Sequence, residues 1–235
     1  MTTVLLLRHG RTAANANGVL AGWTPGVELD ETGRAQAATL ATRLADLPLA
    51  RVVSSPLERC RQTAEAVLAG RPAPQLSVDE RVGECRYGEW TGQPLKSLAK
   101  QRLWKTVQAH PSAVTFPGAE GESMLAMQTR AVAAVREHDA AVRAEHGDAA
   151  VWAVVSHGDV IKAVLADALG LHLDQFQRIV VDPCSVSVLR YTELRPFVLR
   201  VNDTGAALAA LAPPKRGRRR RASSDAVVGG GAGSA

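Results

Sequence analysis

Residues 4–10 read Val-Leu-Leu-Leu-Arg-His-Gly, and residues 153–158 read Ala-Val-Val-Ser-His-Gly. In both segments a short apolar run, typical of a strand buried on both faces of a sheet, ends at a histidine followed by glycine. Ligands of open α/β sheets bind beyond the carboxyl ends of parallel strands. If the two strands are parallel neighbours, His9 and His157 lie at one edge of the sheet, where each glycine lets the backbone turn sharply or approach a ligand closely.

The chain up to about residue 204 alternates strand-like and helical segments. Asp30 can cap a helix, and the segment Ser55-Pro56-Leu57-Glu58 combines a capping box with a proline at the first helical position. This alternation predicts an α/β fold, a three-layer sandwich with a mostly parallel central sheet flanked by helices. The pattern predicts strands at 4–7, 51–54 and 151–156, helices at 30–46, 55–69, 95–109, 122–145 and 160–169, and extended segments at 179–181, 185–191 and 197–201.

The composition is that of a globular protein with an aliphatic core. Of 235 residues, 46% are hydrophobic, 22% are charged and only 4% are aromatic. No apolar run approaches the roughly 18 residues of a membrane span, and the first residues lack the pattern of a signal peptide. The three scattered cysteines argue against a disulfide framework and a cysteine-based zinc site. These features predict a cytoplasmic location.

The net charge of +5 belongs to the end of the chain. Residues 213–235 hold six basic residues and one acidic residue, which leaves 22 of each sign in the remainder. The pI of 9.5 is therefore no sign that the body binds nucleic acid. We expect a folded domain at 1–204 and a disordered basic tail, rich in Gly, Ala and Ser, at 205–235. The tail could weakly contact nucleic acid or an anionic surface, although a solvated extension is the simpler expectation.

Four side chains near the predicted strand ends suit a phosphate group. The strand at 51–54 leads into a helix that carries Arg59 in its early turns, which brings Arg59 towards Arg8 and the two histidines. Arginine presents a fork of donors that matches phosphate oxygens. Histidine can attack phosphorus as a neutral imidazole, or donate to a phosphoryl oxygen as an imidazolium. The sequence therefore predicts a phosphate site at this edge of the sheet.

The same residues resemble the histidine phosphatase superfamily, which includes the cofactor-dependent phosphoglycerate mutases. The resemblance covers roughly residues 1–204. One such tripeptide alone is a weak signal, but five blocks occur here in the expected order. They are Arg8-His9-Gly10, the segment from Ser54 to Ala64, the segment from Glu84 to Gly92, Gly121-Glu122-Ser123 and His157-Gly158.

The resemblance implies a role for each of five residues. His9 is implied to be the nucleophile that forms a phosphohistidine. Arg8, Arg59 and His157 are implied to hold the transferred phosphoryl group. Glu84 is implied to donate a proton to the leaving oxygen and later to act as the base for water.

The substrate-binding set implied by the resemblance also contains Thr12, Asn15 and Gly158. Asn15 has an alternative, which is to close a turn before a glycine. Glu89 is the chief rival of Glu84 as the acid. No metal and no other cofactor is implied, because cationic side chains neutralise the charge that Mg²⁺ neutralises in kinases.

The segment after the Tyr-Gly block separates phosphatases from mutases within this resemblance. A mutase must hold a second anionic group, and in the mutases an adjacent arginine pair and a lysine serve this purpose. Residues 93–105 offer separated cations but no such pair. We therefore expect a phosphatase that acts on a small phosphorylated metabolite. The alternatives are a phosphoglycerate mutase, a phosphatase of protein-bound phosphate and a non-catalytic protein that binds a phosphate ligand; a homodimer is also possible.

Aromatic residues near the predicted mouth of the site have two readings. The mouth is expected to be formed by residues 18–27 and 90–121, which contain Trp23, Trp90, Trp104 and Phe116. They could stack on an apolar or ring-bearing leaving group. Packing within the domain is the more common fate of such side chains.

Overall fold

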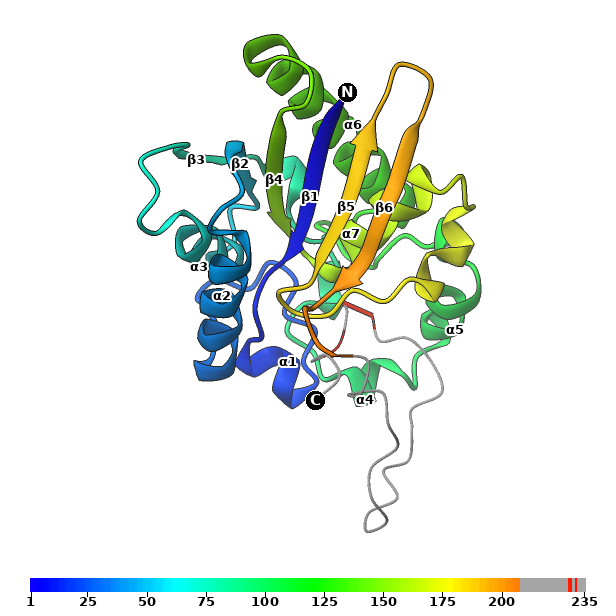
Figure 1. The fold of residues 1–235 in the computed structure, drawn as a ribbon. Coiled ribbons are helices and arrows are strands. Elements are labelled where there is room, and N and C mark those ends of the chain that lie inside the picture. The colour runs from blue at the N-terminus through cyan, green and yellow to red at the C-terminus, as the bar shows by residue number, and fades with distance from the viewer. Residues whose placement is uncertain (208–227, 230, 232–235) are drawn as a thin grey trace.

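The computed structural model describes residues 1–207, 228, 229 and 231, and a six-stranded sheet forms its centre (Figure 1). The strand order is β3-β2-β4-β1-β5-β6. The first four of these strands are parallel, whereas β5 and β6 run antiparallel at one edge. The strands are β1 (Thr2–Arg8), β2 (Leu49–Ser54), β3 (Leu76–Val78), β4 (Val151–Ser156), β5 (Val186–Tyr191) and β6 (Pro196–Asp203).

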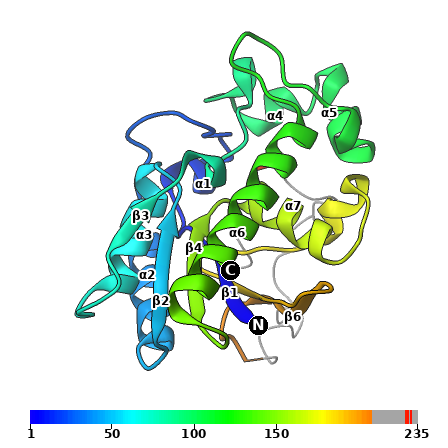
Figure 2. The ribbon, with the colours of Figure 1, turned by 90° about the horizontal axis from the view of Figure 1, so that it is seen from above.

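Helices cover both faces of the sheet, as Figure 2 shows from above. On one face lie α2 (Glu31–Leu44) and α3 (Glu58–Leu68), which pack with the apolar side chains of β1 and β2 in one core cluster. On the other face lie α6 (Met124–His146) and α7 (Gly158–Ala168), which contribute to a second cluster. The expected three-layer α/β sandwich is confirmed, with an antiparallel edge added to its parallel strands.

One short α-helix and one short strand lie outside the predicted elements, and one predicted helix is divided in two. The segment 95–109 forms α4 (Leu95–Leu98) and α5 (Arg102–Ala109) rather than one helix. Helix α1 (Ala13–Asn17) and strand β3 were not predicted, and residues 179–181 form no strand. The 3₁₀ helices are η1 (Glu80–Val82), η2 (Gly88–Trp90), η3 (Pro111–Ala113) and η4 (Leu173–Arg178).

One of the two predicted helix caps is present. Asp30 caps α2 by accepting a hydrogen bond from the amide of Gly33 at 2.7 Å. The capping box predicted at Ser55 is wrong, because α3 begins at Glu58 and its N-cap, Leu57, makes no side-chain cap. The Ser55 hydroxyl lies instead 2.8 Å from the ring of His157, so the candidate site uses this side chain.

The segment between residues 88 and 123, which contains α4 and α5, forms a cap beyond the carboxyl ends of the parallel strands. Helix α1 lies at the same end of the sheet (Figure 1). The aromatic residues of the cap extend the core cluster that lies under α6 and α7. Trp90 is buried, and its ring lies 5.5 Å from that of Phe116 and 6.1 Å from that of Trp104. These three of the four aromatic residues therefore pack against each other.

The last part of the chain is described only in places. Residues 204–207 form neither helix nor strand, and the expectation of a disordered tail otherwise falls largely outside the described residues. The described residues Val228, Gly229 and Gly231 lie against the candidate site. Within the described ranges, no helix is both long and apolar enough to cross a membrane.

Candidate active site

The two predicted histidines lie side by side at the carboxyl ends of neighbouring parallel strands. In the register of β1 and β4, Arg8 is opposite Ser156, and the amide of His9 donates to the carbonyl of Ser156 at 3.0 Å. The rings of His9 and His157 consequently lie 5.2 Å apart, centroid to centroid. The adjacency expected from the two Val/Leu-rich runs is confirmed.

His9 is oriented through its own backbone neighbour. Its Nδ1 lies 2.7 Å from the carbonyl of Gly10 and can only be the donor there, which leaves the lone pair on Nε2. Burial, together with the charges of Arg59 and Arg8, lowers the pKa of His9 well below its usual value, so the ring is neutral. Gly10 permits a close approach, because a Cβ there would lie 2.6 Å from the carbonyl oxygen of Gly33.

His157 is held between a guanidinium and a hydroxyl. Arg59 donates from Nη2 to Nδ1 of His157 at 3.2 Å and to the carbonyl of Gly22 at 2.9 Å. Because a guanidinium has no acceptor, Nδ1 accepts and the Nε2 proton points to the hydroxyl of Ser55. The Sγ atom of Cys60 lies 3.4 Å from the same Nε2. Sequence reasoning missed the role of Ser55.

Two buried arginines give the site its positive charge. Arg59 Nη1 is buried and makes no hydrogen bond to any described residue, as expected of a donor kept for an anion. Arg8 donates to the carbonyl of Val181 and to that of Gly231, each at 2.7 Å. Across the described part of the chain, no three His, Cys, Asp or Glu side chains are grouped as metal ligands.

Glu84 lies beside His157, and its environment favours the protonated form. The Oε2 atom of Glu84 is 3.7 Å from His157 Nδ1, and the amide of Cys85 donates to Oε1 at 3.0 Å. Burial first and the charge of Asp159 second raise the pKa of Glu84 to about 7. The rival acid, Glu89, is exposed. The geometry therefore favours Glu84 as the proton donor.

Arg130 on α6 fixes the loop that carries Glu84, and sequence reasoning did not find it. Its guanidinium donates to the carbonyl oxygens of Arg81, Gly83 and Glu84 and forms an ion pair with Glu122 at 2.6 Å. Glu122 also accepts from the amide of Arg86 at 2.8 Å. These contacts explain the Gly-Glu-Ser block, since its glutamate ties the acid loop to α6. In the sequence, the Gly121-Glu122-Ser123 block was the one sign that this segment contributes to the site.

The other three predicted binding residues divide into two groups. Thr12 and Asn15 bond to each other in a capping box at the start of α1, with Thr12 Oγ1 donating to Asn15 Oδ1 at 2.9 Å. This contact is the alternative given for Asn15, the closing of a turn. Gly158 is the first residue of α7, directly after His157, where its amide belongs to the helix N-terminus.

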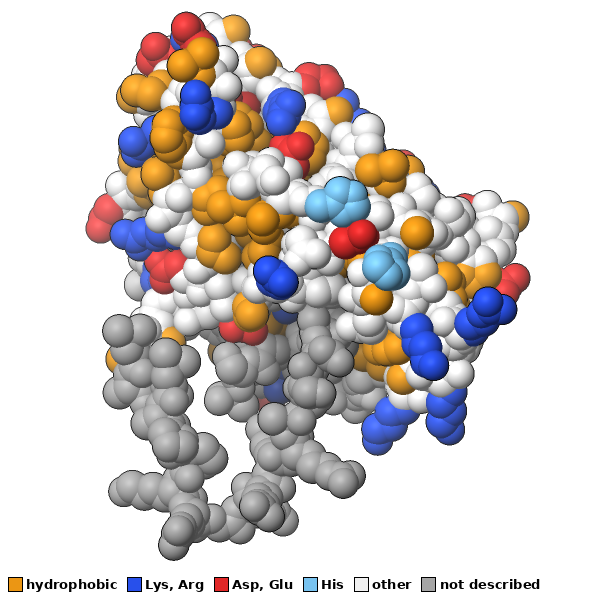
Figure 3. All heavy atoms as spheres, turned by 90° about the vertical axis from the view of Figure 1, so that its right-hand side faces the viewer, with side chains coloured by type: hydrophobic (Ala, Val, Ile, Leu, Met, Phe, Trp, Pro, Cys, Tyr) orange, Lys and Arg blue, Asp and Glu red, His pale blue; other side chains and the backbone are white. Residues whose placement is uncertain are grey.

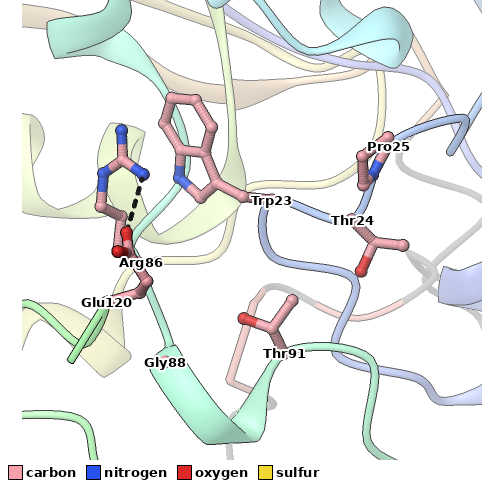
Figure 4. Close-up of a pocket in the computed structure, with 7 residues that line it drawn as sticks. All are labelled: Trp23, Thr24, Pro25, Arg86, Gly88, Thr91 and Glu120. Carbon is pink, nitrogen blue, oxygen red and sulfur yellow. Dashed lines mark ion pairs between the residues drawn. The ribbon is translucent and has the colours of Figure 1, made fainter. Parts of the chain in front are cut away.

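Trp23, the fourth aromatic residue, lines a cavity. The cavity measures about 380 Å³, and Figure 4 shows it between Trp23, Arg86 and Thr91. The Arg86 guanidinium lies 4.1 Å above the centre of the Trp23 ring. The indole N–H donates to the carbonyl of Glu84 at 2.6 Å, so one wall of the cavity is bonded to the loop that carries the acid.

The family description of the histidine phosphatase superfamily (branch 1) matches residues 4–204. The chain belongs to this superfamily. It is 30% identical over 209 residues to phosphoserine phosphatase 1 of Hydrogenobacter thermophilus, and this alignment covers 87% of this chain and 93% of that protein. It is 46% identical over 85 residues to an adenosylcobalamin/alpha-ribazole phosphatase of Salmonella typhimurium, and this alignment covers 36% of this chain and 41% of that phosphatase.

A solved structure agrees with the family assignment. The structure of Bacillus stearothermophilus YhfR superposes with a TM-score of 0.77 at 27% identity, covering 86% of this chain and 98% of that one. The similarity in structure is therefore not confined to the five short blocks of sequence.

Proposed function

We propose that this member of the superfamily is a metal-independent phosphomonoesterase that hydrolyses a small phosphorylated metabolite through a phosphohistidine on His9. One observation carries the proposal: a neutral His9 with its lone pair on Nε2 lies among Arg8, Arg59 and His157, with Glu84 beside them. Nucleophile, anion-binding cations and acid are thus gathered at one strand edge.

The first step forms the phosphohistidine. His9 Nε2 attacks phosphorus as the bond to the ester oxygen breaks, and Glu84 gives its proton to that oxygen. Because burial raises the pKa of Glu84, this proton is present near neutral pH. A positioned acid contributes about 10²- to 10⁴-fold to such a step.

The second step returns the enzyme to its starting state. The ionised Glu84 takes a proton from water, the resulting oxygen attacks phosphorus, and the N–P bond breaks. Phosphate leaves, His9 is neutral again and Glu84 is protonated. The cations hold the phosphoryl oxygens through both steps, which is positioning and charge stabilisation rather than covalent assistance. Activity is accordingly expected to survive exhaustive EDTA treatment; a loss that Mg²⁺ or Zn²⁺ restores would contradict this mechanism.

Hydrolysis is favoured over the mutase reaction by the placement of the cap cations. A mutase must bind the carboxylate of phosphoglycerate while its phosphohistidine is kept from water. The cations of residues 93–105 are all exposed, namely Lys96, Lys100, Arg102 and Lys105. Such cations hold an anion weakly compared with the buried arginines of the phosphoryl site.

The test is phosphate release by the purified protein from nitrophenyl phosphate and from a panel of small metabolites. The panel includes phosphoserine and α-ribazole phosphate, because relatives of this chain carry the names of phosphatases for them. Turnover with trapped, acid-labile phosphate on the protein supports the proposal. Binding of these esters without turnover would favour the non-catalytic alternative, and phosphoryl transfer between phosphoglycerates would favour the mutase.

Partners and location remain predictions. Edge strand β6 exposes Phe197, Leu199 and Val201, and hydrophobic side chains gather on the side of the molecule drawn in Figure 3. This face would serve a homodimer, which sedimentation of the purified protein tests. A cytoplasmic location and a weak contact of the basic tail with nucleic acid or an anionic surface stay as predicted from the sequence.

A further inference from the structure

A piece of the chain's own C-terminal end lies in the candidate site as a ligand would. Val228 is 2% exposed and belongs to the same core cluster as Tyr87. The amide of Gly229 donates to Asp159 Oδ2 at 2.8 Å, and the carbonyl of Gly231 accepts from Arg8 Nη2 at 2.7 Å. The site therefore binds a hydrogen-bond donor at Asp159 and a hydrogen-bond acceptor at Arg8.

The two groups of this bound peptide set an upper limit on the length of a ligand that could replace them. The amide of Gly229 and the carbonyl of Gly231 are separated by three residues of chain, which span at most about 10 Å. In a phosphomonoester of a short amino alcohol, the separation of the ammonium and a phosphoryl oxygen lies within that limit. The carbonyl on Arg8 stands where a phosphoryl oxygen would lie, and the N–H on Asp159 stands where a donating group of the leaving alcohol would lie.

Asp159 has an oxygen left over for such a donor. It is 1% exposed and follows His157-Gly158 in the first turn of α7. Its Oδ2 accepts from the hydroxyl of Tyr87 at 2.8 Å as well as from Gly229. Its Oδ1 has no hydrogen-bond partner within the described ranges, and Lys162 Nζ is 3.9 Å away. Oδ1 thus has a long ion pair but no hydrogen bond, and a cationic ligand group would supply the hydrogen bond that this buried oxygen lacks.

The position of Asp159 also disfavours an anionic leaving group. Asp159 lies close enough to Glu84 to act on its ionisation, and the Tyr87 hydroxyl bonded to Asp159 carries no positive charge. A substrate carboxylate placed there would face two buried acidic side chains, and the buried ammonium of Lys162 is already paired with Asp159. An ammonium in the same place would face an opposite charge at low effective dielectric, where such interactions are strong.

We propose that Asp159 is a specificity-determining residue, and that the preferred substrates are phosphomonoesters of amino alcohols rather than of hydroxy acids. The proposal rests on the phosphatase function proposed above and names the substrate class for the same site. It assigns Asp159 to the leaving group, while Arg8, Arg59 and the two histidines face the phosphoryl group.

The experiment compares two esters of similar size and opposite charge, 2-aminoethyl phosphate and phosphoglycolate, by kcat/KM on the full-length protein. The expected result is a preference of at least about tenfold for the amino ester, equivalent to about 1.4 kcal/mol. Asp159→Asn should reduce that preference by about tenfold or more. Asp167→Asn, on the same helix but paired with Arg136 at the surface, is the matched control and should leave it unchanged.

Nitrophenyl phosphate separates failure of this proposal from failure of the function itself. Turnover of the aryl ester with equal kcat/KM for the two charged esters, or with a preference for phosphoglycolate, would overturn the role of Asp159 and leave the phosphatase intact. Absence of turnover for every ester would overturn both. The wild-type comparison alone decides the substrate class, so a variant that fails to fold does not weaken the test.

Discussion

The two sides of Glu84 differ in charge and in how the chain builds them. On the phosphoryl side, Arg8, Arg59 and the two neutral histidines come from strand ends and the helix that follows β2. On the other side, Asp159 bonds to the Tyr87 hydroxyl and to the C-terminal end of the chain. A phosphomonoester lying across Glu84 would place its dianion on the cations and its alcohol near a carboxylate.

The largest effect is expected on the phosphoryl side, at the nucleophile. His9→Ala should reduce phosphate release to below a few per cent of wild type, because the other histidine of the site, His157, already accepts a hydrogen bond from Arg59 at Nδ1. Acid-labile phosphate should be trapped on wild type and be absent from the variant. His146→Ala, an exposed histidine, serves as the control. Residual turnover above a few per cent in a folded His9→Ala protein would exclude His9 as the obligate nucleophile.

Glu84→Gln tests whether the carboxyl group between the two sides donates the proton to the leaving oxygen. The loss should reach about 10²- to 10⁴-fold for alkyl esters, whose leaving oxygen needs a proton, and be far smaller for nitrophenyl phosphate. Linear free-energy plots against the pKa of the leaving alcohol measure this difference. Glu89→Gln is the matched control. Leaving-group dependence in the Glu89 variant instead would mean that the acid has been assigned to the wrong carboxylate.

The dependence of kcat/KM on pH tests the role of Glu84 in the unmodified protein. The pKa of Glu84 is raised by burial to about 7, so the acid is protonated below that pH and is lost as pH rises through it. For an alkyl ester, kcat/KM should therefore fall about tenfold per pH unit above the pKa. The lowered pKa of His9 places its protonation well below pH 6.5. The basic limb should disappear in Glu84→Gln; its persistence there would assign it to another group.

The smallest effect is expected from the other side, on removal of the C-terminal end. A protein that ends after Ala207 lacks the tethered groups on Asp159 and Arg8, so its KM for small esters should fall about two- to tenfold. A full-length control with alanine in place of Arg218 through Arg221 should keep the wild-type KM. Loss of most turnover in a truncated protein with a normal circular dichroism spectrum would mean that the end of the chain helps to build the site.

The phosphoryl side could be predicted from the sequence because its geometry follows from strand ends. Two apolar runs that each end in His-Gly become neighbours once the strands pair in parallel, and Arg59 follows from the next strand. The fold class, the family and the juxtaposition of His9 and His157 therefore follow from the sequence alone.

The other side could not be predicted, because its contacts join residues far apart in sequence. Arg130 reaches the acid loop 46 residues away, and Gly229 reaches Asp159 across 70 residues. The composition of the tail predicts a separate, disordered segment, yet the described residues Val228, Gly229 and Gly231 contact the site. The local pattern predicts a helix cap at Ser55, whereas the ring of His157, far away in sequence, is the competing partner of its hydroxyl.

The Cys60 thiol lies beside His157, and its ionisation determines how readily oxidants react at the site. Burial raises the pKa of Cys60 to about 12, and all three cysteines in the chain are free and buried. Sulfenic acid formation and alkylation proceed through the thiolate, which is then nearly absent at neutral pH. We therefore expect the Cys60 thiol, 3.4 Å from a histidine of the site, to react slowly with oxidants and with alkylating agents.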